Sequence, residues 1–222
     1  MTSPGVIYKN LIIVGSSVSE GNPAAKGNIR AFDANTGDLI WSFNTIPEKG
    51  EDGHESYNDP DAYRRLGGAN AWSGLTLDEK RGILYAPTGS VSYDFYGGDR
   101  IGDNLFANSI VALNAETGNK IWHFQTVHHD VWDRDLPSPP ILFNYSMNDS
   151  IVPSLAQVTK SGYIYLLNRI TGKPLYEIVE RDVPSKSNLE GEVLSKTQPI
   201  PTFPEPFSRQ SLTKNDINPF IK

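Results

Sequence analysis

Residues Ala31–Trp41 read AFDANTGDLIW, and residues Ala112–Trp122 repeat this pattern as ALNAETGNKIW. A third and weaker copy, LLNRITGKPLY, spans Leu166–Tyr176 and ends in tyrosine instead of tryptophan. Each copy predicts two strands joined by a tight turn. The Asp or Asn at its third position bonds turn amides, and the Gly at its seventh accepts a positive φ. The terminal tryptophan is large enough to dock against a neighbouring unit.

Further pairs of short strands are expected before each hairpin, at 6–15, at 72–78 with 82–88, and at 155–160. Four short antiparallel strands per unit are typical of a β-propeller blade. No stretch shows sustained helical periodicity. The sequence therefore predicts an all-β fold of consecutive four-stranded blades. At roughly 40–45 residues per blade, residues 1–182 supply three to four blades, so we expect the chain to be part of a larger propeller.

Three segments lie outside the repeated strands. Residues 46–68 and 91–108 lack core periodicity and are expected to form long loops on one rim of the propeller. Residues 183–222 contain PIPTFPEPF. This composition predicts an extended, Pro-rich loop or tail without regular structure, leading to the missing blades.

Composition narrows the classes of partner. The chain has 20 basic and 26 acidic residues, a formal net charge of −6, and no basic run, so nucleic acids and anionic membrane surfaces are poor partners. The absence of cysteine excludes disulfides and thiolate chemistry. No apolar run approaches the roughly 20 residues of a membrane span, and no signal peptide is recognisable in these residues. A small ligand, neutral or metal-assisted, fits better.

The segment Thr126–Pro137, TVHHDVWDRDLP, has the highest density of titratable groups. It follows a strand-like segment directly and ends on a proline, which stops strand pairing. Titratable groups just past a strand end are often where a scaffold carries chemistry. A polar loop of solvated acids is the plainer interpretation.

Several motifs together resemble the family of pyrroloquinoline-quinone (PQQ) dependent dehydrogenases, in particular its glucose, quinate and shikimate dehydrogenase branch. They are the hairpins, TVHHDVWDRDLP, YGGDR at 96–100 and TKSGYIYLLNRITGKP at 159–174. The resemblance extends from Thr2 to about Gln198. It implies consecutive blades of an eight-bladed propeller that holds PQQ and a divalent metal, usually calcium, on its axis.

The resemblance also implies how the cofactors are held. Glu20, after the turn Gly15-Ser16-Ser17, matches a metal ligand, and hard cations prefer carboxylate oxygen. Ser16 and Ser17 would hold a PQQ carboxylate, and Thr2 matches a cofactor-contacting threonine. An ordinary acidic loop residue is the plainer interpretation of Glu20.

Trp72, Asp133 and Lys160 match the family's reacting centre. Trp72 would lie flat against the quinone, Asp133 would be the catalytic base and a metal ligand, and Lys160 would bond the ortho-quinone oxygens. A core tryptophan and a surface lysine are the plainer interpretations. Ser90 stands where alcohol-oxidising members have a metal-binding asparagine, which leaves the ligand set open. Asp135 matches an extra metal ligand of lanthanide-using relatives, but the glucose branch also carries an acid there, so no lanthanide is inferred.

The implied function is oxidation of a sugar or polyol hydroxyl by hydride transfer to PQQ. Asp133 would take the hydroxyl proton, while the metal and Lys160 would stabilise charge growing on the quinone oxygens. A quinone or cytochrome would accept the electrons, in the periplasm or at a membrane facing it. The chain would be a fragment that is inactive alone.

Two alternatives stay open. One is a non-catalytic propeller scaffold of the outer-membrane assembly type, which has no reason to keep Glu20, Trp72, Asp133 and Lys160 at these spacings. The other is a quinoprotein dehydrogenase that acts on an alcohol, quinate or another polyol.

Overall fold

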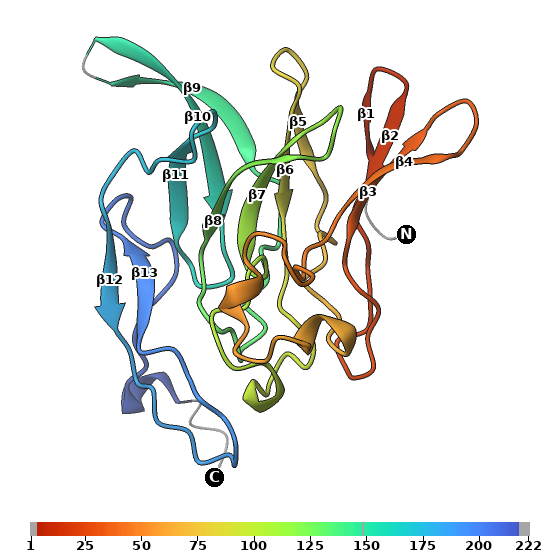
Figure 1. Ribbon diagram of the computed structural model, residues 1–222. Coiled ribbons are helices and arrows are strands. Elements are labelled where there is room, and N and C mark those ends of the chain that lie inside the picture. The colour runs from red at the N-terminus through yellow and green to blue at the C-terminus, as the bar shows by residue number, and fades with distance from the viewer. Residues whose placement is uncertain (1–3, 148, 218–222) are drawn as a thin grey trace.

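The structure is a computed structural model that describes residues 4–147 and 149–217, and Figure 1 shows sheets that follow one another side by side. The first sheet contains β1 (Val6–Tyr8), β2 (Leu11–Val14), β3 (Ile29–Asp33) and β4 (Leu39–Phe43) in chain order. The second contains β5 (Thr76–Asp78), β6 (Ile83–Pro87), β7 (Ser109–Asn114) and β8 (Lys120–Gln125), again in chain order. The third contains β9 (Ile141–Met147), β10 (Ser150–Val158) and β11 (Ile164–Asn168). The predicted all-β fold of successive antiparallel sheets is confirmed.

The three repeats form the predicted turns. In the first, Asp33 Oδ1 accepts the amides of Asn35 and Thr36 at 2.8 and 3.0 Å. Asn114 and Asn168 hold the equivalent amides in the second and third repeats. The glycines that follow, Gly37, Gly118 and Gly172, have φ of 79°, 74° and 72°. The same side-chain-to-backbone bonds therefore build all three turns.

The tryptophan that ends each strong repeat docks on the turn of the next repeat, as predicted. Trp41 Nε1 donates to the Ala115 carbonyl at 3.3 Å, and Trp122 Nε1 donates to the Arg169 carbonyl at 3.1 Å. The first sheet is thus joined to the second, and the second to the third.

Strand β7 is buried on both faces because it belongs to the middle sheet. Val111 and Leu113 belong to a core cluster shared with the first sheet, which includes Ile13 and Ile29. The alternate residues Ile110 and Ala112 belong to a cluster with Leu155 and Leu167 of the third sheet, among others. Two hydrophobic layers therefore separate three sheets.

The long loops gather at the end of the sheets opposite the hairpin turns (Figure 1). Residues 46–68 carry the 3₁₀ turns η1 (His54–Ser56) and η2 (Ala62–Arg64), and residues 91–108 carry η3 (Gly98–Arg100). These loops have their own hydrophobic cluster, which includes Ile46, Tyr57, Leu66 and Val91. They are packed structures rather than loose excursions.

One expected strand is shorter than predicted. The strand expected at 72–78 begins only at Thr76, because Gly74 at φ 111° turns the chain after Trp72. Trp72 therefore lies on the loop side of the sheet.

The third sheet departs from the four-stranded pattern. Pro174 occupies the position that begins β4 in the first repeat, and without an amide it cannot continue a strand ladder. Only an isolated bridge between Leu167 and Pro174 remains. The chain instead forms β12 (Ile178–Asp182).

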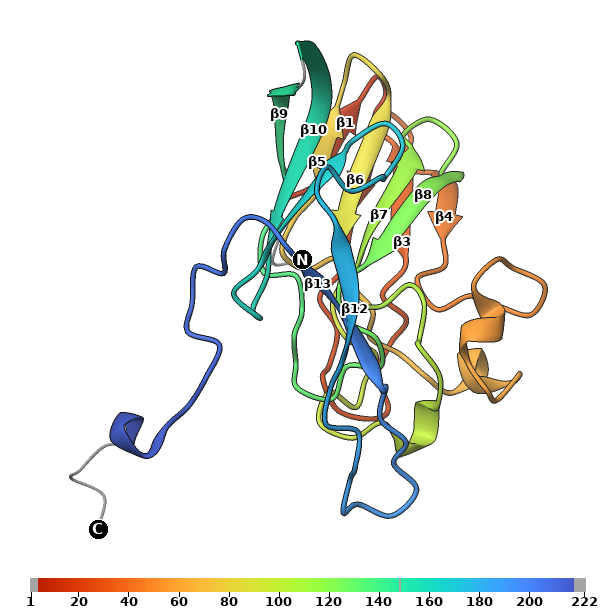
Figure 2. The same ribbon diagram turned by 90° about the vertical axis from the view of Figure 1, so that its left-hand side faces the viewer.

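The prediction that residues 183–222 lack regular structure is wrong for Thr197–Pro201, which form β13 and pair with β12. Alternate residues point their amides to the same side of a strand, so Pro199 and Pro201 leave the amides facing β12 intact. After β13 the chain extends away from the sheets to η4 (Lys214–Asp216), as Figure 2 shows.

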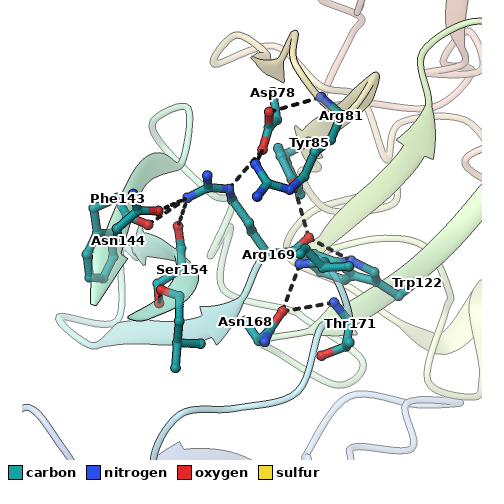
Figure 3. Close-up of polar contacts among 12 residues, drawn as sticks. Asp78, Arg81, Tyr85, Trp122, Phe143, Asn144, Ser154, Asn168, Arg169 and Thr171 are labelled. Carbon is teal, nitrogen blue, oxygen red and sulfur yellow. Dashed lines mark hydrogen bonds and ion pairs between the residues drawn. The ribbon is translucent and has the colours of Figure 1, made fainter. Parts of the chain in front are cut away.

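A buried ion pair holds the third sheet on the second (Figure 3). Arg169 Nε lies 2.9 Å from Asp78 Oδ2, and both side chains are at least nine-tenths buried. The Arg169 carbonyl also accepts the Tyr85 hydroxyl at 2.9 Å. Side chain and backbone of one residue therefore bind the neighbouring sheet.

Candidate functional site

A polar pocket of about 200 Å³ lies among the loops at the end of the first and second sheets. Four predicted site residues line it, namely Ser17, Glu20, Trp72 and Lys160. They come from the loop after β2, the loop before β5 and the turn after β10. The fold thus brings together residues that are up to 143 positions apart in the sequence (17 to 160).

Trp72 is anchored by its edge. Its Nε1 donates to Asp135 Oδ2 at 2.7 Å, and Asp135 Oδ1 accepts the amide of Ser90 at 2.6 Å. Gly89 makes this approach feasible, because a Cβ there would lie 2.6 Å from Asp135 Oδ1. The hydrogen bond at its edge therefore fixes the half-buried indole, which lines the pocket.

Lys160 links the indole to the segment 126–137. Its Nζ lies 2.7 Å from Asp133 Oδ1, 4.0 Å from Asp135 Oδ2 and 5.8 Å from the centre of the Trp72 ring. The side chains of Lys160 and Asp133 are 33% and 31% exposed. Lys160 thus lines the pocket, whereas its partner Asp133 lies beside Lys160 but is not among the lining residues.

The remaining predicted residues differ in their placement. Ser16 lies beside the pocket, and its buried Oγ has no hydrogen-bond partner among the described residues. Its carbonyl accepts Asn70 Nδ2 at 3.0 Å. Thr2 lies outside the described residues. Asn70 lines the pocket but carried no recognisable signal in the sequence.

Asp94 is a second pocket residue, after Asn70, that the sequence did not single out. It is 5% exposed and lines the pocket. Burial raises its pKa to about 7, and Asp135, Asp133 and Glu20 act in the same direction against Arg100. Its only signal was its place in the acidic 91–108 loop, because its burial depends on what packs around that loop.

Asp135 has a similar environment. Burial raises its pKa, with Asp133 acting in the same direction, while the Ser90 amide, Lys160 and the Trp72 indole oppose the shift. The pocket wall therefore combines several carboxylates with one ammonium, an electrostatic arrangement that favours a bound cation.

Ser90, which stands where alcohol-oxidising members have a metal-binding asparagine, lines the pocket, but its hydroxyl is bonded inside the fold. Its hydroxyl donates to Asp130 Oδ2 at 2.6 Å, and Asn108 Nδ2 lies 3.2 Å from the same hydroxyl. The serine at this position therefore has its hydroxyl turned into the fold.

Part of the donor set of a cofactor site is present. The orphaned Ser16 Oγ and the oxygen-rich wall fit a polar, metal-assisted ligand. Within residues 4–147 and 149–217, no three His, Asp or Glu side chains converge tightly enough to hold a metal ion. The pocket is also smaller than the roughly 300–1,000 Å³ of typical ligand sites. The described residues therefore form a polar pocket whose donors suit such a ligand but do not enclose one.

Comparisons with known proteins show which family this chain resembles. The family model described as glucose/ethanol/alcohol dehydrogenase, beta-propeller domain (PQQ), matches residues 1–221. Quinoprotein glucose dehydrogenase A of Acinetobacter calcoaceticus is 38% identical over 90% of this chain and 25% of its own length. Quinate/shikimate dehydrogenase (quinone) of Acinetobacter baylyi is 36% identical over 98% of this chain and 27% of its own length.

A solved structure extends the likeness to three dimensions. The quinohemoprotein alcohol dehydrogenase of Comamonas testosteroni superposes with a TM-score of 0.70 at 27% identity, over 90% of this chain and 31% of that chain. The chain spans about a quarter of the length of the two curated relatives. No helix in the described ranges is long and apolar enough to cross a membrane.

Proposed function

The chain belongs to the PQQ family of glucose, ethanol and alcohol dehydrogenase β-propeller domains, and we propose that it forms one sector of an enzyme that oxidises a sugar or polyol hydroxyl. In this proposal the three sheets within residues 1–182 are consecutive blades of the larger propeller. The segments 46–68 and 91–108 are its rim loops on the side of the cofactor.

One observation carries the proposal. Lys160 lines one pocket together with Trp72 and Glu20, and its ammonium makes a 2.7 Å ion pair with Asp133. A base, a cation, a planar aromatic wall and a hard-metal ligand are the groups that hydride transfer to a quinone requires. A non-catalytic scaffold has no use for this combination.

Asp133 would act as the base. Its side chain is 31% exposed, and in this proposal its carboxylate would accept the proton of a substrate hydroxyl. Lys160 holds Asp133 in place and supplies a positive charge at the same point, which would stabilise negative charge that develops during the reaction. When bound, PQQ supplies the hydride acceptor.

Residues in the loops around the pocket would hold the cofactors. Glu20 and Asp133 would donate carboxylate oxygens to a divalent metal, and calcium suits such ligands. Ser16 and Ser17 would bond a PQQ carboxylate, and Thr2, which lies outside the described residues, would also contact the cofactor. Trp72 would provide the flat surface for the ring system.

Relatives named for glucose and for quinate or shikimate support a polyhydroxylated substrate over a simple alcohol. A quinone or cytochrome electron acceptor, and a location in the periplasm or on a membrane facing it, are parts of the same proposal. An alcohol substrate is the second candidate, because the solved relative is an alcohol dehydrogenase.

Cofactor analysis tests the proposal. The whole enzyme, of which this chain would form one sector, is purified, extracted for quinone and analysed for metal. Dye-linked oxidation of glucose, quinate and ethanol is then measured after loading with PQQ and calcium. We expect PQQ-dependent oxidation of glucose or quinate. If the protein from its own cells holds neither quinone nor divalent metal and oxidises none of the three substrates, the proposal fails.

A further inference from the structure

The carboxylate of Asp130, near the pocket, accepts four hydrogen bonds from the protein. It is 3% exposed, and its Oδ1 accepts the amide of Trp132 at 3.0 Å. Its Oδ2 accepts the amide of Arg134 at 2.5 Å, the hydroxyl of Ser90 at 2.6 Å and Nδ2 of Asn108 at 3.0 Å. Four donors from three segments thus converge on one side chain.

Two of these donors flank the proposed base. The amides of Trp132 and Arg134 belong to the residues on either side of Asp133, whose φ is 51°. A residue with a Cβ rarely adopts this left-handed conformation, and it persists only where the surroundings fix it. The Asp130 carboxylate therefore holds the peptide group that follows Asp133 and the one between Val131 and Trp132.

The other two donors attach the turn to the second sheet. Ser90 follows β6 and Asn108 immediately precedes β7, so both come from rigid strand ends. Arg100, which is 2% exposed, also donates to the backbone carbonyl of Asp130. Hydrogen bonds therefore attach the turn 130–134 to the second sheet and to the loop 91–108.

We propose that Asp130 is a positioning residue for Asp133. Its carboxylate holds the turn 130–134 in the backbone conformation that presents Asp133 to Lys160. Asp130 itself is fully engaged with the protein and touches no reacting atom. The inference rests on the proposed function, in which Asp133 is the base.

Asparagine at 130 is a sharp probe of this role. All four partners of the carboxylate donate in the structure, and an ionised carboxylate accepts only. An amide would turn its NH₂ group toward at least one backbone N–H. The turn would lose a hydrogen bond without losing side-chain volume, and the carboxylate of Asp133 would shift.

The first experiment compares Asp130→Asn with the parent in the whole enzyme that contains this chain, both loaded with PQQ and calcium, using glucose and an artificial dye as acceptor. Turnover per bound PQQ should fall on the order of 10²-fold, as expected for a misplaced reacting group, while the KM for glucose changes little. Asp33→Asn is the matched control. Asn114 and Asn168 make the same turn bonds in the other repeats, so this variant should keep parent turnover.

A double substitution separates positioning from a general structural effect. If Asp130 acts through Asp133, adding Asp130→Asn to Asp133→Asn should lower turnover no further. Equal losses in both backgrounds would overturn the inference, and so would full turnover per bound PQQ in Asp130→Asn. Full turnover in Asp133→Asn would instead remove the base from the proposed function. If Asp130→Asn does not fold, Ser90→Ala, which removes one anchoring donor, carries the same comparison.

Discussion

The indole of Trp122 rests on the turn that contains Gly172. A Cβ at Gly172 would lie 2.7 Å from Trp122 Cδ2, and Trp122 Nε1 bonds the carbonyl of Arg169 in the same turn. Trp41 and Gly118 repeat this relationship one sheet earlier, with a Cβ distance of 2.6 Å to Cε3. The glycine at the seventh repeat position therefore serves two purposes, a positive φ and the close approach of a neighbouring indole.

The glycines allow these two purposes to be separated. Gly37 has the same turn conformation, yet a Cβ there would meet nothing within 4 Å. Gly37→Ala should cost only the left-handed strain of about 1–2 kcal/mol. Gly118→Ala and Gly172→Ala should cost roughly 1–3 kcal/mol more, because the added methyl overpacks the indole. Urea unfolding of the three variants checks this, and equal losses would contradict the docking role.

Loss of Arg169 should destabilise the chain far more than loss of Arg81, although both guanidinium groups contact Asp78. Burial alone would raise the pKa of Asp78, but hydrogen bonds from Arg169 and Arg81 hold it below its ordinary value. Arg169→Met should cost about 3–5 kcal/mol, since it leaves a buried carboxylate without its main partner. Arg81→Met, at a partly exposed site, should cost about 1 kcal/mol or less. Urea unfolding at pH 7 distinguishes the two variants. A similar loss of unfolding free energy in both would show that Arg169 is not the main link between the second and third sheets.

Lys160→Ala should lower turnover more than it weakens PQQ binding. The ammonium contributes most when charge develops in the reaction, and removal of one such group commonly costs about 10²–10³ in rate. Lys9→Ala is the control, because it removes another 2.7 Å ion pair, with Glu116, on residues that do not line the pocket. Turnover and PQQ affinity are measured in the loaded protein. Unchanged turnover would remove Lys160 from the reacting centre.

Asp94→Asn should stabilise the metal-free chain at alkaline pH. The raised pKa of Asp94, about 7, means that the folded state binds this proton more tightly than the unfolded state, where a carboxyl titrates near 4. The free energy of unfolding therefore falls as pH rises from about 4 to about 7, and the penalty is complete above pH 7. Asparagine removes the penalty, on the order of 1–4 kcal/mol at pH 8, and should change little at pH 4. Thermal unfolding with EDTA at both pH values measures this, with the exposed Asp38→Asn as control. A gain that is equal at both pH values would contradict a titrating Asp94.

The 222-residue chain by itself should bind PQQ weakly. Its pocket of about 200 Å³ offers one wall, and an axial site in a ring is assembled from blades on all sides. Quenching of tryptophan fluorescence during a PQQ titration, with Trp72→Phe as control, provides the measurement. Tight binding at one PQQ per chain would show that the wall is sufficient.

The local parts of the fold and the spacing of the reacting groups were evident in the sequence. Hairpin turns depend on side chains that bond amides two and three residues away, so Asp33, Asn114 and Asn168 predicted them directly. The docking of Trp41 and Trp122 followed from the repeat. Glu20, Trp72, Asp133 and Lys160 were selected by their resemblance to a family. In the structure Glu20, Trp72 and Lys160 line one pocket, and Asp133 contacts Lys160, while their roles stay predictions.

The tertiary structure decided what depends on packing between distant segments. Arg169 and Asp78 are 91 residues apart, and no local pattern marks them as partners. Asp94 was one acid among several in a loop, and its pKa is raised by the burial that neighbouring loops impose. Strand β13 formed despite its prolines, because pairing requires only every second amide. The burial of Asp130 and its four hydrogen bonds depend on segments that only the fold brings together. The sequence alone therefore could not assign Asp130 its position next to the Asp133 turn.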